Sequence, residues 1–482
     1  MSQNVHAVDF PTHLPWLNTK EPLTLAKLKG HVVLLDFWTY CCINCIHVLP
    51  DLKYLEHKYK NEPFVVIGVH SAKFENEKDA QNIQSAIDRY EIEHPVLVDN
   101  SHLLWNAYGI RSWPSFVLID PEGYVRGVAS GEGLRAPLSQ GIDQLLEEAK
   151  KKGTLVEKPL EISFESKKST GILSFPGKLL LRDKRLFISD SNNNRILITE
   201  LEEAEEPKAK IIDQIEGLDH PQGICLVGKL LYICDTENHT LKEYNLETKS
   251  LRTLAGTGQQ ARTRQTELGD PLETALNSPW DLDYKDGKLY IAMAGPHQIW
   301  SYDVLSEELE IYAGSGVENI LDGPRLGAQL AQPSGISIYK DYLYFADSEV
   351  SALRRINLLT EEVESLVGSG LFDFGRDDGP FAEARLEHCL GVDAQAEEVF
   401  IADTYNHSIR RADLSTSTLE TVIAKVAHDV CRIGDKSCQM LPLFEPNDVQ
   451  RVGDKLYIAD TNNHLIRVFD LKTKDLINLE IY

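Results

Sequence analysis

The sequence DFWTYCCINC occupies residues 36–45 and places three of the chain's eight cysteines side by side or one helical turn apart. It follows an apolar run at residues 32–35, which is short and rich in β-branched side chains, as a buried strand would be. After it, apolar residues recur at helical spacing over residues 46–55. The cysteines are therefore predicted to lie where a strand turns into a helix.

Cys42 would stand at or near the N-terminus of this helix, where free backbone N–H groups and the helix dipole favour a thiolate. Cys45 follows three residues later on the same helix face and can close a disulfide with Cys42. We therefore predict thiol–disulfide exchange, in which Cys42 is the nucleophile and Cys45 resolves the mixed disulfide. Two other interpretations stay open: half of a zinc site, which would need a second ligand pair, or two inert thiols.

The composition narrows the classes of partner. The 482 residues are long enough for two or three domains, and a formal charge of −25 argues against binding a nucleic acid. The N-terminus lacks a signal sequence and no uncharged apolar run reaches about 18 residues, so we expect no export and no membrane contact. The few cysteines favour a reducing compartment, the cytoplasm. We expect a monomer with a protein partner, without a cofactor and without a metal.

Residues 1–152 alternate strand-like and helix-like stretches, which is typical of an α/β layer. Within them, Asp-Phe-Trp before the C-x-x-C pair and a later Trp113-Pro114 resemble the motifs of a thioredoxin-like domain. The longer segment between Val69 and Pro95 resembles the insertion of the peroxiredoxin and TlpA-like branch. By this resemblance, Pro114 is the cis-proline that faces the cysteine pair. Asp36 is then the buried carboxylate behind it, either a proton acceptor for Cys45 or a strand-end carboxylate satisfied by hydrogen bonds.

The site also departs from the thioredoxin-like pattern. Cys41 replaces the tryptophan that usually precedes the first cysteine, and Ile-Asn fills the centre of the motif where a proline is common. Cys41 is either a third redox thiol or a small apolar filler. Trp38 and Trp113 are predicted to border a substrate groove, which Trp113 would narrow. These departures do not change the predicted fold. The redox potential of the pair and the direction of exchange, however, do not follow from the resemblance.

From about residue 170 the chain repeats itself. The recurring core is a Leu-Tyr-Ile-Ala-Asp-like stretch with six copies, at residues 186–190, 231–235, 289–293, 343–347, 399–403 and 456–460. About four short strands per copy, with Gly, Asp and Asn turns between them, predict the blades of a closed six-bladed propeller. The repeat resembles the NHL repeat.

Several propeller residues have both a functional and a structural interpretation. His239, His297, His407 and His464 occupy equivalent places and would either ring a metal or serve the turns. Residues that stabilise a turn are expected to recur in every blade, whereas metal ligands need not recur with the repeat. The structural interpretation is therefore favoured. Cys431 and Cys438 share a loop, where they could pair under oxidation.

The predicted organisation is a thioredoxin-like domain at 1–152, a polar linker at 153–169 with one possible extra strand at 160–164, and a six-bladed NHL propeller at 170–482. This combination resembles the NHL repeat-containing protein 2 family. It implies a thiol–disulfide oxidoreductase whose propeller recruits a protein substrate. The alternative is a non-catalytic interaction scaffold that has kept the thioredoxin fold.

Overall fold

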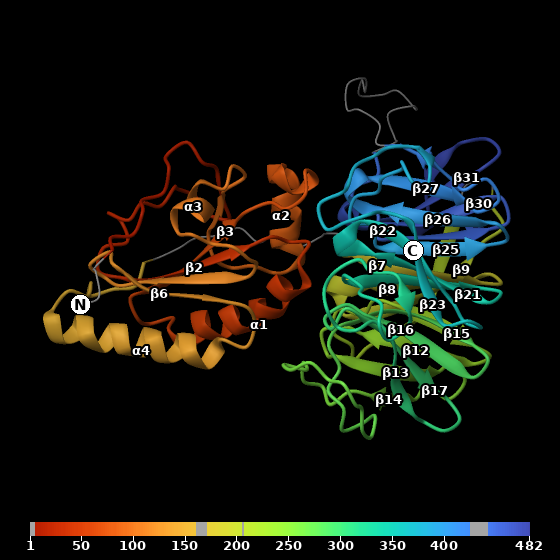
Figure 1. The fold of residues 1–482 in the computed structure, drawn as a ribbon, viewed down its shortest axis with the longest axis horizontal. Helices are drawn as coiled ribbons and strands as arrows, with labels where there is room; N and C mark the ends of the chain where they lie inside the picture. The colour runs from red at the N-terminus through yellow and green to blue at the C-terminus, as the bar shows by residue number, and fades with distance from the viewer. Residues whose placement is uncertain (1–4, 161–170, 205–206, 425–441) are drawn as a thin grey trace. The chain divides into compact units, whose positions relative to one another are not determined.

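The computed structural model describes residues 5–160, 171–204, 207–424 and 442–482. The chain divides into two compact units, Met1–Lys168 and Ser169–Tyr482. The first is an α/β layer around one sheet and the second is all-β with six sheets (Figure 1), which confirms the predicted fold class. The strand predicted at 160–164 falls, apart from its first residue, outside the described residues. Of the described helices, none is long and apolar enough to span a membrane.

The sheet of the first unit has the strand order β1-β4-β3-β2-β5-β6. Its strands are β1 (Trp16–Leu17), β2 (Val32–Trp38), β3 (Phe64–His70), β4 (Val96–Val98), β5 (Ser115–Ile119) and β6 (Val125–Ser130). The central strand β2 is parallel to β3 and antiparallel to β5, and all seven of its residues are buried. The apolar run 32–35 is thus the first half of a longer strand.

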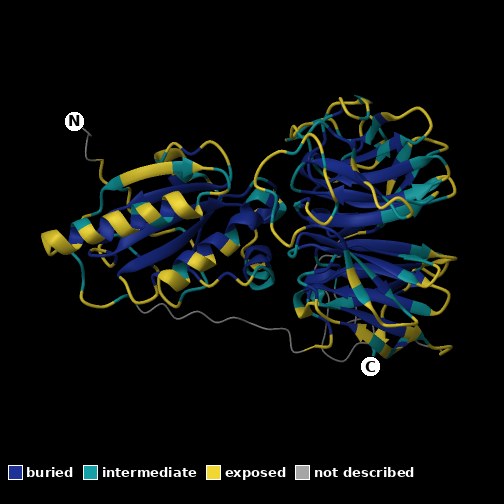
Figure 2. Cartoon of the chain, turned by 90° about the horizontal axis from the view of Figure 1, so that it is seen from below, coloured by how far each residue is buried: buried dark blue, intermediate teal, exposed yellow. Residues whose placement is uncertain are grey.

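Helices cover the sheet on both faces. They are α1 (Ile43–Lys58), the 3-10 helix η1 (Asn76–Lys78), α2 (Ala80–Arg89), α3 (Leu103–Ala107) and α4 (Arg135–Lys152). Because side chains alternate along a strand, Leu34 of β2 packs with Leu52 of α1 and Ile142 of α4, while Leu35 packs on the other face with Leu104 of α3. Strands β2, β3, β4 and β5 are buried, the edge strand β6 is largely exposed, and the helices are exposed on their outer sides (Figure 2).

The second unit is built from six antiparallel blades in chain order. The first blade contains β7 (Pro176–Arg182), β8 (Arg185–Asp190), β9 (Arg195–Leu201) and β10 (Lys208–Ile215). The second contains β11 (Ile224–Val227), β12 (Leu230–Asp235), β13 (Thr240–Asn245) and β14 (Leu251–Ala255). The third contains β15 (Pro279–Lys285), β16 (Lys288–Met293), β17 (Gln298–Asp303) and β18 (Leu309–Ala313). The fourth blade contains β20 (Pro333–Tyr339), β21 (Tyr342–Asp347), β22 (Ala352–Asn357) and β23 (Glu362–Val367). The fifth contains β25 (Gly391–Gln395), β26 (Glu398–Asp403), β27 (Ser408–Asp413) and β28 (Thr418–Ile423). The sixth contains β29 (Asp448–Val452), β30 (Lys455–Asp460), β31 (Leu465–Asp470) and β32 (Leu476–Asn478). Each repeated core is the second strand of its blade.

Short elements complete the blades. They are the edge strands β19 (Gly323–Pro324), β24 (Gly379–Pro380) and β33 (Glu480–Ile481) and the 3-10 helices η2 (Ser191–Asn193), η3 (Ser348–Val350), η4 (Thr404–Asn406) and η6 (Thr461–Asn463). β33 pairs in parallel with β10, so the first blade contains strands from both ends of the unit. The backbone N–H of Leu179 on β7 also donates to Asp448 Oδ2 on β29 at 3.0 Å. The first and last blades are thereby joined and the ring is closed.

The four repeated histidines connect neighbouring blades. Each accepts a backbone N–H through Nδ1 at 3.0–3.1 Å, in the pairs Ser278–His239, Gln332–His297, Glu445–His407 and Phe175–His464. Asn194 and Ser351 do the same at the equivalent positions of the first and fourth blades, through Oδ1 and Oγ. A bond that repeats around the ring identifies these histidines as structural, and the Phe175–His464 bond joins the two ends of the propeller.

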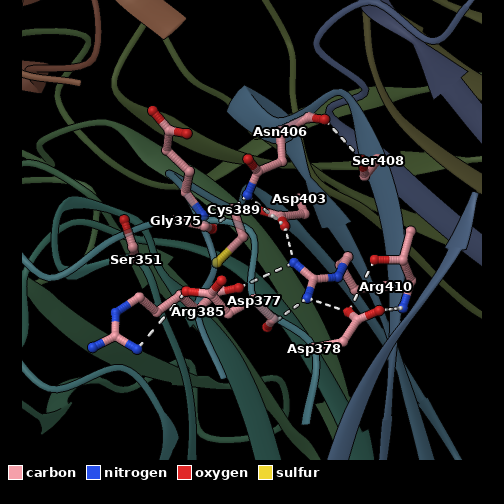
Figure 3. A network of polar contacts seen from close by, with 12 residues as sticks. Ser351, Gly375, Asp377, Asp378, Arg385, Cys389, Asp403, Asn406, Ser408 and Arg410 are labelled. Carbon is pink, nitrogen blue, oxygen red and sulfur yellow. Dashed lines mark hydrogen bonds and ion pairs between the residues drawn. The ribbon is translucent and has the colours of Figure 1, made fainter. Parts of the chain in front are cut away.

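Buried arginines hold two of the long loops. Arg410 of β27 is fully buried and donates to Asp403 at 2.7 Å and to Asp378, in the loop before β25, at 2.6 Å (Figure 3). Arg354 of β22 repeats the arrangement with Asp347 at 2.8 Å and Asp322 at 2.9 Å. Buried, charge-assisted hydrogen bonds of this kind fix a loop firmly to its blade.

Replacing His464 by alanine is expected to lower the free energy of unfolding of the propeller by about 1–3 kcal/mol, because the Phe175 N–H loses its acceptor. His464→Asn is the matched control, since Asn194 makes the same bond and asparagine tolerates the positive φ of this position. Chemical denaturation of the full chain measures the difference. Equal losses in the two variants would contradict this role of the imidazole.

The same bond predicts a pH dependence. Burial lowers the pKa of His464 from its ordinary 6.5, so the folded state favours the neutral ring, whose Nδ1 accepts the bond. The unfolded chain binds more protons in this range, so the contribution is full above pH 6.5 and is lost as the pH falls through the folded pKa. On acidification, wild type should therefore lose stability relative to His464→Asn, whose side chain does not titrate; an unchanged relative stability across this pH range would contradict the prediction.

Candidate active site

The cysteine motif lies at the start of α1, directly after β2. Cys42 is the N-cap, and its carbonyl accepts the backbone N–H groups of Cys45 at 3.0 Å and Ile46 at 3.2 Å. Cys42 is partly exposed, whereas Cys41 and Cys45 are each 1% exposed. Of the three thiols, Cys42 is therefore the one that an external disulfide can reach.

Cys45 is held in its protonated form. Burial raises its pKa well above the ordinary value, and a hydrogen bond with the Cys42 side chain and the negative charges of Cys42 and Asp36 raise it further. The thiolate is the nucleophile in disulfide chemistry. Cys45 therefore requires a nearby proton acceptor before it can attack.

Asp36 is a carboxyl whose charge acts on Cys45. It lies on β2 two residues after Leu34, on the face of the sheet that α1 covers, and is fully buried. Burial raises its pKa to about 7, although the charge of His94 lowers it, and neither carboxyl oxygen has a hydrogen-bond partner among the described residues. A carboxyl with this pKa exchanges its proton near neutral pH.

Pro114 and Trp113 lie at the same end of β2. The Trp113–Pro114 peptide bond is cis, and the next residue, Ser115, pairs with Phe37 across β5 and β2. Trp113 is partly exposed and packs on Trp105 with ring centroids 4.5 Å apart. The substrate groove beside Trp113 stays a prediction.

The same prediction is wrong for Trp38. Its side chain is 1% exposed and packs edge-on against the buried ring of His70, with centroids 5.1 Å apart. Trp38 follows the alternation of β2 and points under α1, so it cannot line an open groove.

A buried carboxylate holds the segment before Cys42. Glu77 of η1 is fully buried, and it accepts the Cys41 N–H at 2.9 Å through Oε1 and the N–H groups of Lys73 at 2.9 Å and Phe74 at 3.0 Å through Oε2. The Cys41 sulfur lies 3.9 Å from Thr39 Oγ1. Cys41 thus faces the interior, which favours the interpretation as filler.

The sequence did not identify Glu77, His94 or Glu56 as parts of this site. The sequence around Glu77 does not distinguish it from an ordinary acidic residue near the start of a helix. His94 and Glu56 are distant from Asp36 in the sequence and approach it only in the folded domain. Among the described residues, no group of three or more His, Cys, Asp or Glu is placed to hold a metal ion. Cys431 and Cys438 lie outside the described residues.

Comparisons with known proteins agree with this fold. A family model described as thioredoxin-like matches residues 30–125, and one described as the NHL repeat matches residues 218–244. Over 98% of its length the chain is 40% identical to Suppressor of Quenching 1, chloroplastic, of Arabidopsis thaliana, and it spans 48% of that protein. The thiol-disulfide oxidoreductase ResA of Halalkalibacterium halodurans is 32% identical over 111 residues, which cover 23% of this chain and 60% of ResA.

The fold and the matched families define a protein with a thioredoxin-like domain followed by an NHL-repeat propeller. The human NHL repeat-containing protein 2 is 35% identical over 100% of this chain, which spans 72% of the human protein. The chain belongs to the NHL repeat-containing protein 2 family. It covers about half the length of the Arabidopsis relative.

Glu77→Gln is expected to lower the free energy of unfolding of the first unit by about 1–3 kcal/mol, because an amide cannot accept all three backbone N–H groups that the carboxylate accepts. Glu75→Gln is the control, since Glu75 is exposed and pairs with Lys78 on the surface. Chemical denaturation of both variants tests this. A Glu77→Gln protein as stable as the control would show that this carboxylate does not hold the Cys41 segment.

Proposed function

We propose that this protein is a thiol–disulfide oxidoreductase that acts on a disulfide of another protein. One arrangement carries the proposal: Cys42 reaches solvent at the start of α1, Cys45 is protected one turn later, and Asp36 is buried behind them. Thiol exchange requires an accessible nucleophile, a resolving thiol and a group that takes a proton near the working pH. Cys42, Cys45 and Asp36 are suited to these three roles.

The reaction has two steps. The Cys42 thiolate attacks one sulfur of the substrate disulfide, and the other sulfur leaves as a thiolate with the bonding electrons. Cys45 then gives its proton to the Asp36 carboxylate and attacks Cys42 Sγ, so that the Cys42–Cys45 disulfide forms and the second substrate sulfur leaves. The substrate gains two electrons and the cysteine pair loses two. In this proposal Pro114 borders the pair and Trp113 offers the substrate an aromatic surface.

The propeller is proposed to recruit the protein substrate. Its long loops are anchored through Asp322 and Asp378 to buried arginines, and loops held on a rigid scaffold are common binding sites. We also propose a reducing compartment such as the cytoplasm, where the pair would be kept as thiols. The name of one relative places that relative in the chloroplast, which is a second setting for the same chemistry.

The second candidate function is a scaffold that binds partners without turnover. It is favoured by the buried Cys41, which stands where related sites have a tryptophan, and by the absence of a proline between Cys42 and Cys45. The two candidates differ in one chemical property, the ability of Cys42 to form a mixed disulfide.

Cys45→Ser tests this directly. Incubated with glutathione disulfide, the full-length variant is expected to keep one glutathione on Cys42, because the thiol that would release it is missing. Intact-mass spectrometry and peptide mapping detect the adduct.

Two double variants control for the other cysteines. Cys42→Ser on the Cys45→Ser background should take up no glutathione, and Cys41→Ala on that background should keep the adduct, because the Cys41 side chain is buried. Absence of an adduct on Cys42 in Cys45→Ser would contradict the oxidoreductase and leave the scaffold.

A further inference from the structure

Three strands bring His94 close to Asp36. Asp36 on β2 pairs with Gly68 on β3, which in turn pairs with Val96 on β4, and residues in register share one face of a sheet. A Cβ atom built on Gly68 would lie 3.4 Å from His94 Cδ2 and 2.9 Å from Trp38 Nε1. The imidazole of His94 therefore lies over Gly68, on the face that carries Asp36.

Glu56 links this imidazole to the surface. His94 Nδ1 lies 3.3 Å from Glu56 Oε1; the His94 side chain is 3% exposed and that of Glu56 is 23% exposed. Glu56 stands on α1 three turns after Cys45 and so shares its helix face. Burial lowers the pKa of His94, but Glu56, Asp36 and Glu93 raise it more, so its folded pKa lies above the ordinary value.

Few charges surround Asp36. The titratable groups that act on it or face it are Cys45 and Glu56 from α1 and His94 from the segment before β4. The adjacent strands present Gly68 and Phe116, which do not titrate, and burial lowers the pKa of His70 to about 3, so that ring is neutral. Within the described residues, His94 is the one cation that faces this carboxyl.

We propose that His94, held by Glu56, is a positioning residue for the exchange reaction: its positive charge keeps Asp36 available as the carboxylate that takes the proton of Cys45. This inference rests on the proposed function. Without the charge, Asp36 keeps its own proton to higher pH and cannot accept another. Cys45 then stays a thiol, and the mixed disulfide on Cys42 persists longer.

The first test follows the release of glutathione from the Cys42 mixed disulfide in single turnovers of the full chain, across a pH series. The wild-type rate should rise with a midpoint near the pKa of Asp36, about 7. In His94→Gln this midpoint should move up by about one pH unit, with the alkaline plateau unchanged, because an opposite charge has been removed. A purely structural role would lower the whole profile without moving its midpoint.

His57→Gln is the matched control, because His57 is exposed on the same helix, and its profile should coincide with that of wild type. If His94→Gln releases glutathione normally and its midpoint is unshifted, the role of His94 is contradicted while the proposed function stands. A wild-type protein that releases no glutathione contradicts the proposed function, and the role of His94 with it.

A reciprocal measurement covers the case in which His94→Gln does not fold. Coupling between two titrating groups is mutual, so Asp36→Asn should lower the pKa of His94 by about the amount that His94 lowers that of Asp36. NMR titration of the histidine-labelled full chain measures this shift, with the His94 signal assigned by its loss in His94→Gln or His94→Ala. An unshifted pKa of His94 in Asp36→Asn would overturn the inference even if thiol exchange occurs.

Discussion

The burial of Asp36 is the constraint on which the candidate site depends. A carboxyl removed from water is costly to ionise, and here its pKa rises to about 7. Asp36 lies on β2, which also leads directly into the turn that ends at Cys42, so one element positions both the carboxyl and this thiol. Burial, and to a smaller degree the charge of Asp36, raises the pKa of Cys45 on α1. A carboxylate whose pKa is raised in this way is a stronger proton acceptor than one in water.

In the propeller, the main constraint is that the repeated blades must join into a closed ring. Backbone N–H groups that face the next blade find side-chain acceptors, mostly the repeated histidines, and the last strand, β33, returns to the first blade. A closed ring of blades leaves only short sheet edges that could pair with other chains. The loops that Arg354 and Arg410 anchor are therefore presented from a stiff frame.

Much of this could be predicted from local pattern. The strand-to-helix turn and the six repeated cores follow from periodicity, whereas the place of Pro114 was implied by the resemblance to a thioredoxin-like domain. Trp38 was misplaced, although the alternation that sends Leu34 under α1 sends Trp38 there too. Glu77 carries no local signal, since its partner Cys41 is 36 residues away. The two-residue strand β33 is too short for any periodicity, and its pairing with β10 exists only in the closed ring.

The central claim is that Cys42 and Cys45 form a working redox pair. Equilibrium titration of the full chain in glutathione buffers, with thiols counted by alkylation and mass spectrometry, tests it most directly. The account predicts one two-electron transition of this pair, with a potential in the range of catalytic disulfides, about −270 to −120 mV. Failure of the two thiols to oxidise together, or a potential below about −300 mV, as structural disulfides have, would contradict it.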